Sequence, residues 1–286
     1  MPVFVGSFRG VTAVLSISTA ALLCLATVST FGLRASRLLP TASFPKLWLW
    51  WMRVWFPSYF YRYIPGKVML VAERVRLGAR LGIPPATSVL LVVWESGLLV
   101  AGSAVFGAVG LLIRPPDGGL VSPPAVVALA AISLVGCLAF PLVLRTMVRW
   151  FPALGARIPG LALEVPAAAQ LGLILGNAGC WCLLGVSFAL TARLFEGGGD
   201  VDVASLVIWF VGSYVVGQVS SVTPAGIGVR EAVLVAGLAG IAPAPLVLAW
   251  AIANRLVLAA VEGTLLLGSL ALPFPQSPPD GEEATR

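Results

Sequence analysis

Long apolar runs dominate the pattern of hydrophobic and polar positions along this chain. A helix that crosses a bilayer needs about 20 mainly apolar residues. Five segments reach that length: residues 11–33, 86–112, 124–147, 166–192 and 246–271. The pattern therefore predicts an all-α fold, a polytopic integral membrane helical bundle.

Two further apolar stretches, residues 46–64 and 203–222, end at breaks that contain Pro and Gly. A charged helical stretch to about residue 82 follows the first break. The piece after the second, residues 229–240, is too short to span a membrane. We expect each stretch and the helix after it to form a re-entrant, broken-helix hairpin.

The two predicted hairpins resemble each other. Each has Pro and Gly at its break, charged residues in its second helix, and a Gly-Ile pair (Gly82 or Gly240) before a long apolar helix. Because three predicted spans lie between the copies, the second hairpin enters from the opposite face, which makes an inverted repeat. Broken helices in inverted repeats point to a binding site near the membrane midplane, as in secondary transporters.

The composition excludes most soluble classes. Of the 286 residues, 59% are hydrophobic and 10% are charged, against about 45–50% and about 25% in a typical soluble domain. The chain has no His, which excludes His-dependent triads and His metal sites. The pair Gly226 and Gly228 lacks the third Gly and the strand context of a dinucleotide-binding loop. We therefore expect no enzyme activity, no metal and no cofactor.

The net charge of +6 is explained by membrane topology rather than by nucleic acid, because cytoplasmic loops of membrane proteins are enriched in Lys and Arg. This rule places residues 34–46, 74–85 and 145–165 in the cytoplasm, and residues 113–123 and 193–202 outside. The predicted N-terminus is outside and the C-terminus inside. Residues 1–272 then form a single transmembrane domain, and residues 273–286 a disordered cytoplasmic tail.

Charged residues at membrane depth are the candidate functional groups, since each costs roughly 2.5–3.5 kcal/mol on insertion scales unless it finds a partner or water. Arg230 and Glu231 begin the short helix of residues 229–240. Unpaired N–H groups and the helix dipole favour an anion such as phosphate at such a start. The predicted substrate-binding residues are Pro65, Gly66, Lys67, Glu95, Pro224, Gly226, Gly228, Arg230, Glu231 and Arg255.

Structural alternatives remain for these and other charges. Glu95 and Arg255 are alternatively a structural ion pair, and Arg53 and Arg62 can extend to the membrane interface. Glu73, Arg74 and Arg76 can form a solvated interfacial face, and Arg230 and Glu231 can be purely structural.

The aromatic cluster of residues 48–63 also has two interpretations. It is either an interfacial belt or an apolar wall along which lipid tails slide.

Two segments resemble signatures of a known family. Residues 223–231, Thr-Pro-Ala-Gly-Ile-Gly-Val-Arg-Glu, with Gly240 and Arg255 further on, resemble a signature of the flippase-like transmembrane family. Residues 61–67, Tyr-Arg-Tyr-Ile-Pro-Gly-Lys, resemble its earlier signature. The resemblance covers residues 11–271, and Ala225 stands where the family more usually has Gly. The family includes the membrane half of lysylphosphatidylglycerol synthases.

The resemblance implies a stand-alone member, without the aminoacyl-transferase half, in the bacterial cytoplasmic (inner) membrane. Its implied function is a membrane lipid translocase. Such a protein moves an anionic lipid, such as an aminoacylated phospholipid or a polyprenyl-phosphate-linked sugar, without ATP hydrolysis. Its partners are then membrane lipids with anionic headgroups. The alternative is a non-transporting membrane subunit that anchors or regulates a glycosyltransferase or lipid-modifying enzyme.

Overall fold

A computed structural model describes residues 3–39, 42–64, 68–113, 123–152, 165–219 and 226–274. This part of the chain is helical apart from its turns and loops, and its β pairing is limited to one bridge between Phe4 and Phe195. The α-helices are α1 (Phe8–Ala35), α2 (Phe44–Phe60), α3 (Val68–Gly78), α4 (Pro85–Ile113), α5 (Pro123–Trp150), α7 (Ala167–Ala192), α8 (Val203–Val219), α9 (Val229–Gly237) and α10 (Ala244–Leu270). Two 3-10 turns, η1 (Tyr61–Tyr63) and η3 (Ala79–Leu81), follow α2 and α3.

The all-helical prediction is confirmed. Within the described residues α1, α4, α5, α7 and α10 are long and apolar enough to cross a membrane, and they coincide with the five predicted segments. Local sequence determines the start of α1. The Ser7 side chain accepts a hydrogen bond from the Gly10 N–H at 3.1 Å at the start of α1, a typical N-cap. These five helices are consistent with an integral membrane bundle.

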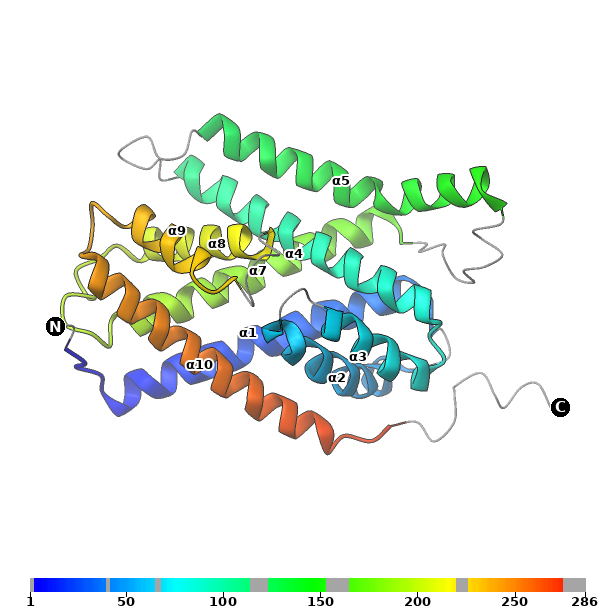
Figure 1. The fold of residues 1–286 in the computed structure, drawn as a ribbon, viewed down its shortest axis with the longest axis horizontal. Helices are drawn as coiled ribbons and strands as arrows, with labels where there is room; N and C mark the ends of the chain where they lie inside the picture. The colour runs from blue at the N-terminus through cyan, green and yellow to red at the C-terminus, as the bar shows by residue number, and fades with distance from the viewer. Residues whose placement is uncertain are drawn as a thin grey trace.

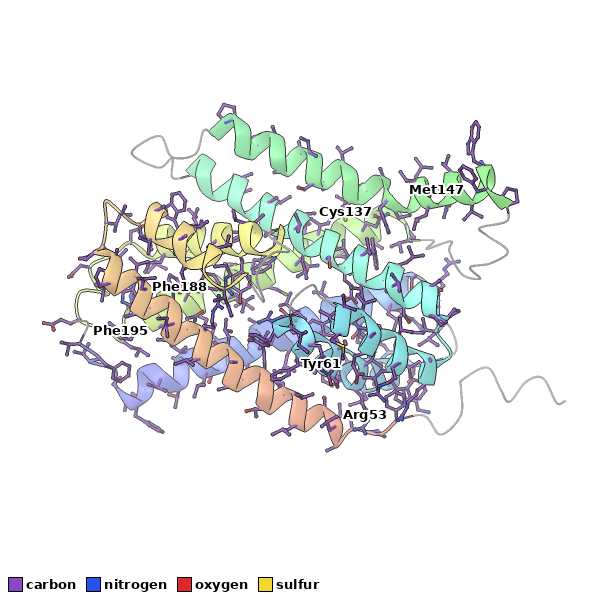
Figure 2. The ribbon with its side chains drawn as sticks, viewed as in Figure 1. Arg53, Tyr61, Cys137, Met147, Phe188 and Phe195 are labelled. Carbon is purple, nitrogen blue, oxygen red and sulfur yellow. The ribbon has the colours of Figure 1, made fainter. Side chains whose placement is uncertain are left out.

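The long helices run along the longest dimension of the molecule (Figure 1). Helix α1 begins at the end marked N and finishes at the opposite end, where α10 also finishes. Figure 2 shows Phe195 at the first end and Arg53 and Met147 at the second. At that second end the Arg53 guanidinium donates to the Ser269 carbonyl at 3.2 Å, which attaches α2 to the last turn of α10.

Two pairs of shorter helices complete the bundle. Helices α2 and α3 pack against each other, and so do α8 and α9. The α2–α3 pair lies in the half of the molecule nearer Arg53, and the α8–α9 pair in the half nearer the N-terminus (Figures 1 and 2). Helices α2 and α8 each have 17 residues, α3 has 11 and α9 has 9, all below the length of about 20 that spans a bilayer. The predicted breaks at residues 65–67 and 220–225 lie outside the described residues.

Helix α7 lies at the centre of the packing, against α1, α4, α8 and α10, whereas α5 packs mainly on α4 at one edge. Helices α4 and α7 approach closely at Gly102. A Cβ atom at this position would lie 2.7 Å from the Asn177 Cβ and 3.0 Å from backbone atoms of Ile174 and Ala178. A small residue is therefore required at this crossing, as is common between membrane helices.

Three of the aromatic residues of α2 do not match either expectation for residues 48–63, whereas Trp48 and Trp50 are half-buried and Phe60 is exposed. Trp51, Trp55 and Phe56 are 1%, 4% and 4% exposed, so they belong neither to an interfacial belt nor to a lipid-facing wall. The Trp51 Nε1–H donates to the Ser29 Oγ at 2.7 Å, and Trp55 stacks on Tyr59 with ring centroids 4.3 Å apart. The reason is that α2 is covered by α1, α3 and α10, and its large rings fill the space between them.

Gly102→Ala is expected to lower the free energy of unfolding by about 1–3 kcal/mol, because the added methyl group meets backbone atoms of α7. Gly107→Ala on the same helix is the matched control, since no atom lies within 4 Å of its built Cβ. Ala is the better helix former, so this control should be neutral or slightly stabilising. Thermal unfolding in detergent compares the two, and equal stability would contradict the close approach.

Candidate functional site

The structure describes six of the ten predicted binding residues. Pro65, Gly66, Lys67 and Pro224 lie outside the described residues, so their role stays a prediction. Gly226, Gly228, Arg230 and Glu231 lie at the start of α9, Glu95 lies in α4, and Arg255 lies in α10.

The turn before α9 depends on glycine. Gly226 and Gly228 have φ angles of 70° and 85°, a region that residues with a Cβ rarely adopt. The Glu231 carboxylate turns back and accepts a hydrogen bond from the Gly228 N–H at 2.7 Å. The same carboxylate forms an ion pair with Arg255 of α10, with 2.8 Å between Glu231 Oε1 and Arg255 Nη2. The two groups are not aligned for a hydrogen bond. A carboxylate of the chain itself thus occupies part of the positive start of α9.

Arg230 is buried without an acidic partner among the described residues. It is 7% exposed, and its Nε has no hydrogen-bond acceptor there. Its guanidinium lies over the Tyr214 ring, 3.3 Å from the centroid. Cation–π contacts of this kind contribute about 2 kcal/mol when desolvated, which offsets part of the cost of burying the charge.

Two glycines make room for the Arg230 side chain. A Cβ at Gly217 would lie 2.5 Å from the Arg230 Cγ, and one at Gly226 would lie 3.2 Å from its Cδ. The aliphatic part of Arg230 therefore passes between α8 and the turn before α9. The predicted residue Gly226 thus has a second role beside its positive φ, and Gly217 was not among the predicted residues.

Arg62 does not extend to the interface as expected. Its Nη2 donates to the Glu262 Oε1 of α10 at 2.5 Å, and its Nη1 donates to the Tyr59 hydroxyl. The Tyr63 hydroxyl donates to the other oxygen of Glu262 at 2.9 Å. Glu262 is 2% exposed, so a buried acid holds Arg62 inside the bundle.

Arg74 is also placed differently from the expectation of a solvated face. It is 2% exposed, and its Nη1 donates to both carboxylate oxygens of Glu95 at 3.1 and 2.9 Å. Its Nε donates to the Ser58 Oγ at 2.8 Å, and the Ser29 hydroxyl donates to Glu95. Arg76, two residues on, faces outward with Glu73 as its partner. The face of α3 that carries Arg74 is therefore buried, and the face that carries Arg76 is exposed.

The alternative in which Glu95 pairs with Arg255 is not what the structure contains. Glu95 pairs with Arg74 of α3, and Arg255 pairs with Glu231 of α9. Each charge takes its partner from the neighbouring short helix pair rather than from the other long helix. The two residues nonetheless have structural partners, as that alternative supposed.

A central cavity of about 80 Å³ lies among α1, α2, α3, α4, α7 and α8. Its lining is mostly apolar but includes the polar and charged residues Ser29, Tyr59, Arg62, Arg74, Glu95, Ser96, Asn177 and Tyr214. Tyr214 joins this cavity to Arg230, since its ring lines the cavity and also carries the Arg230 guanidinium. Within the described residues no group of three or more Cys, Asp or Glu side chains could hold a metal ion.

No family model matches the chain, and no curated protein matches it.

Arg74→Ala is expected to lower the free energy of unfolding by about 3–5 kcal/mol, because it leaves the Glu95 carboxylate without its cation inside the bundle. Arg76→Ala is the control. It removes an arginine from the same helix whose side chain is 58% exposed, and it should cost less than about 1 kcal/mol. Unfolding in detergent, followed by circular dichroism, measures both, and similar losses would contradict the burial difference.

Proposed function

We propose that this protein is a membrane lipid translocase that moves a lipid with an anionic headgroup across the bilayer without ATP hydrolysis. The observation that carries the proposal is Arg230, a buried cation without an acidic partner in the described part of the chain. A buried charge of this kind is costly. A headgroup phosphate at this position would supply the missing negative charge through charge-assisted hydrogen bonds.

The charge environment of Arg230 supports an anionic rather than a cationic ligand. Arg62 and Arg255 lie near enough to Arg230 to interact with it electrostatically. Each of those two has its own acid, Glu262 and Glu231. Among the described residues the local excess of positive charge therefore equals the charge on Arg230, and one phosphodiester would balance it.

The arrangement of the short helix pairs supports re-entrant hairpins in an inverted repeat. The α2–α3 and α8–α9 pairs occupy opposite halves of the molecule, and all four helices are too short to span (Figure 1). In the proposed mechanism the hairpins enter from opposite faces and meet near the midplane, where the headgroup crosses. The lipid tails stay in the surrounding bilayer.

The distribution of basic residues supports the proposed orientation. Arg34 and Arg149 lie in the last turns of α1 and α5, at the end of the molecule that also carries Arg53. The positive-inside rule places this end in the cytoplasm. The N-terminus is then outside and the C-terminus inside, in a bacterial cytoplasmic membrane as the resemblance to the flippase-like transmembrane family implies.

Arg230→Ala is expected to abolish translocation of a fluorescent phosphatidylglycerol in liposomes that contain the purified protein, while the protein stays folded. Its affinity for that lipid should fall about tenfold or more, as expected for the loss of a buried charge-assisted hydrogen bond. Arg76→Ala removes an exposed arginine and is the control for overall charge. Full translocation by Arg230→Ala would refute the phosphate-binding role.

Gly217→Ala is expected to weaken phosphatidylglycerol binding by roughly a few-fold, because the added methyl group displaces the Arg230 side chain. Gly212→Ala on the same helix is its control, since no atom lies within 4 Å of its built Cβ. Native mass spectrometry of the retained lipid compares them. Equal retention in both variants would mean that the position of Arg230 does not matter for lipid binding.

The second candidate is the non-transporting subunit that anchors or regulates a lipid-modifying enzyme or glycosyltransferase. Helix α5 favours it, because it packs mainly on α4 and leaves Ile132, Val135 and Leu142 more than 60% exposed. Such a helix can bind a partner in the membrane. Copurification of a stoichiometric enzyme, with no lipid movement by the chain alone, would support this candidate against the translocase.

A further inference from the structure

The charged groups of the central cavity are balanced among the described residues. Arg74 and Glu95 both line the cavity and pair with each other. Arg62 also lines it and pairs with Glu262, which lies behind the lining. An ion placed in the cavity would find no free charge of opposite sign, and a buried ion without such a partner is unstable. The cavity therefore favours a neutral ligand.

Three neutral polar side chains of the lining have oxygen atoms that are free to bind a ligand. Ser96, Asn177 and Tyr214 line the cavity, and Asn177 and Tyr214 are 4% and 8% exposed. Within the described residues the hydroxyls of Ser96 and Tyr214 make no hydrogen bond. The Asn177 Nδ2 donates to the Leu173 carbonyl at 2.9 Å, which leaves its Oδ1 available. None of these three oxygens is fully shielded from solvent, unlike the Nε1 of Trp94.

The chemistry of these three oxygens indicates a ligand that carries hydroxyl groups. The hydroxyls of Ser96 and Tyr214 can each donate and accept a hydrogen bond, whereas the Asn177 amide oxygen only accepts. A ligand hydroxyl also donates and accepts, so it can bind any of the three. An alkyl group does neither, and a quaternary ammonium group has no hydrogen to donate.

The rest of the lining suits the carbon skeleton of such a ligand. It is mainly apolar and aromatic and includes Trp55 and Trp181, as is usual for small-molecule pockets that contain a few polar groups. The volume of about 80 Å³ is enough for roughly five to eight water molecules at roughly 10–15 Å³ each. A glycerol unit is comparable in size to such a group of waters and can replace them.

We infer that the central cavity binds a neutral group with hydroxyls, such as the glycerol end of a phospholipid headgroup, through Ser96, Asn177 and Tyr214. Tyr214 joins this site to the proposed phosphate position, because its ring lines the cavity and also carries the Arg230 guanidinium. The lipid source rests on the proposed function, and it narrows the substrate to anionic lipids with polyol headgroups. A free polyol shares the same chemistry.

Two lipids that differ in the hydroxyls of their headgroups test the inference. Phosphatidylglycerol and phosphatidylethanol are both phosphodiesters of the same charge, but the headgroup of the second has no hydroxyl. Each is prepared with the same acyl chains and added to the full chain in detergent, and native mass spectrometry measures the bound fraction. Free glycerol is added as a competitor in a separate series.

Two conservative variants remove the proposed contacts, each with a matched control. Tyr214→Phe removes a hydroxyl and keeps the ring, and Tyr61→Phe is its control because Tyr61 lies outside the cavity lining. Ser96→Ala removes the second hydroxyl. Its control is Ser103→Ala on the same helix, because the Ser103 hydroxyl bonds within that helix and lies outside the lining. The thermal unfolding of every variant is recorded.

We expect the wild type to bind phosphatidylglycerol about tenfold more tightly than phosphatidylethanol, as for one or two additional hydrogen bonds. Tyr214→Phe and Ser96→Ala should each weaken phosphatidylglycerol binding about threefold and leave phosphatidylethanol binding unchanged, with both controls at the wild-type values. Competition by free glycerol against phosphatidylglycerol alone would identify the free polyol as a second ligand of the site. No competition would assign the site to the lipid headgroup.

Equal affinity of the wild type for the two lipids would overturn the inference and would mean that the cavity holds water only. A wild-type preference for phosphatidylglycerol in both Tyr214→Phe and Ser96→Ala would overturn it as well, as would wild-type protein that binds neither lipid.

The proposed function fails or stands separately. Arg230→Ala should release both lipids equally, because they share the phosphodiester. If it releases both while the wild type shows no preference, the cavity site is refuted and the phosphate role of Arg230 stands. If it retains both while Tyr214→Phe abolishes the preference, the phosphate role is refuted and the cavity site stands.

Discussion

Ionised side chains inside an apolar bundle must be neutralised where they lie, and the ion pairs that neutralise them connect the helices of the structure. In the described part of the chain three ion pairs do so: Arg62 of η1 with Glu262 of α10, Arg74 of α3 with Glu95 of α4, and Arg255 of α10 with Glu231 of α9. Each pair connects a short helix pair to a long apolar helix. Apolar contacts alone are a weak determinant of helix position in lipid, because lipid tails are as apolar as the side chains. Charge pairing therefore determines where the short helices are held.

Arg230 is the exception to this pattern, and its surroundings show how a bundle can hold a cation without a carboxylate. The faces of Tyr214 and Phe210 take the place of an anion, with Tyr214 the nearer of the two. Aromatic rings carry partial negative charge on their faces but no net charge. Such a site stabilises the guanidinium enough to keep it inside, yet leaves it able to gain energy from an incoming anion. An ion pair, by contrast, would have to be broken first.

Hydropathy was sufficient to predict the five long helices and the shorter apolar stretches between them, because span length depends on local composition. The partners of the buried charges could not be predicted in this way. Arg255 and Glu262 share one face of α10, but the structure pairs them with Glu231 and Arg62, on segments distant in sequence. Arg74 looked solvated because it lies within a charged run, and its burial depends on how α3 packs against α4. Gly217 gave no local signal, since its requirement comes from Arg230 across the turn.

The pairing of Arg62 with Glu262 joins residues that are 200 positions apart in the chain. At synthesis rates of about 5–20 residues per second, the ribosome needs roughly 10–40 s to make the intervening segment. During that time Arg62 exists without its counter-ion, whereas Arg74 of the same helix pair finds Glu95 only 21 residues further on. A lone arginine is costly at membrane depth, so Arg62 is stable there only after α10 has been made. The turn η1 between α2 and α3 therefore takes its final position late, when Glu262 of the last long helix supplies the missing negative charge.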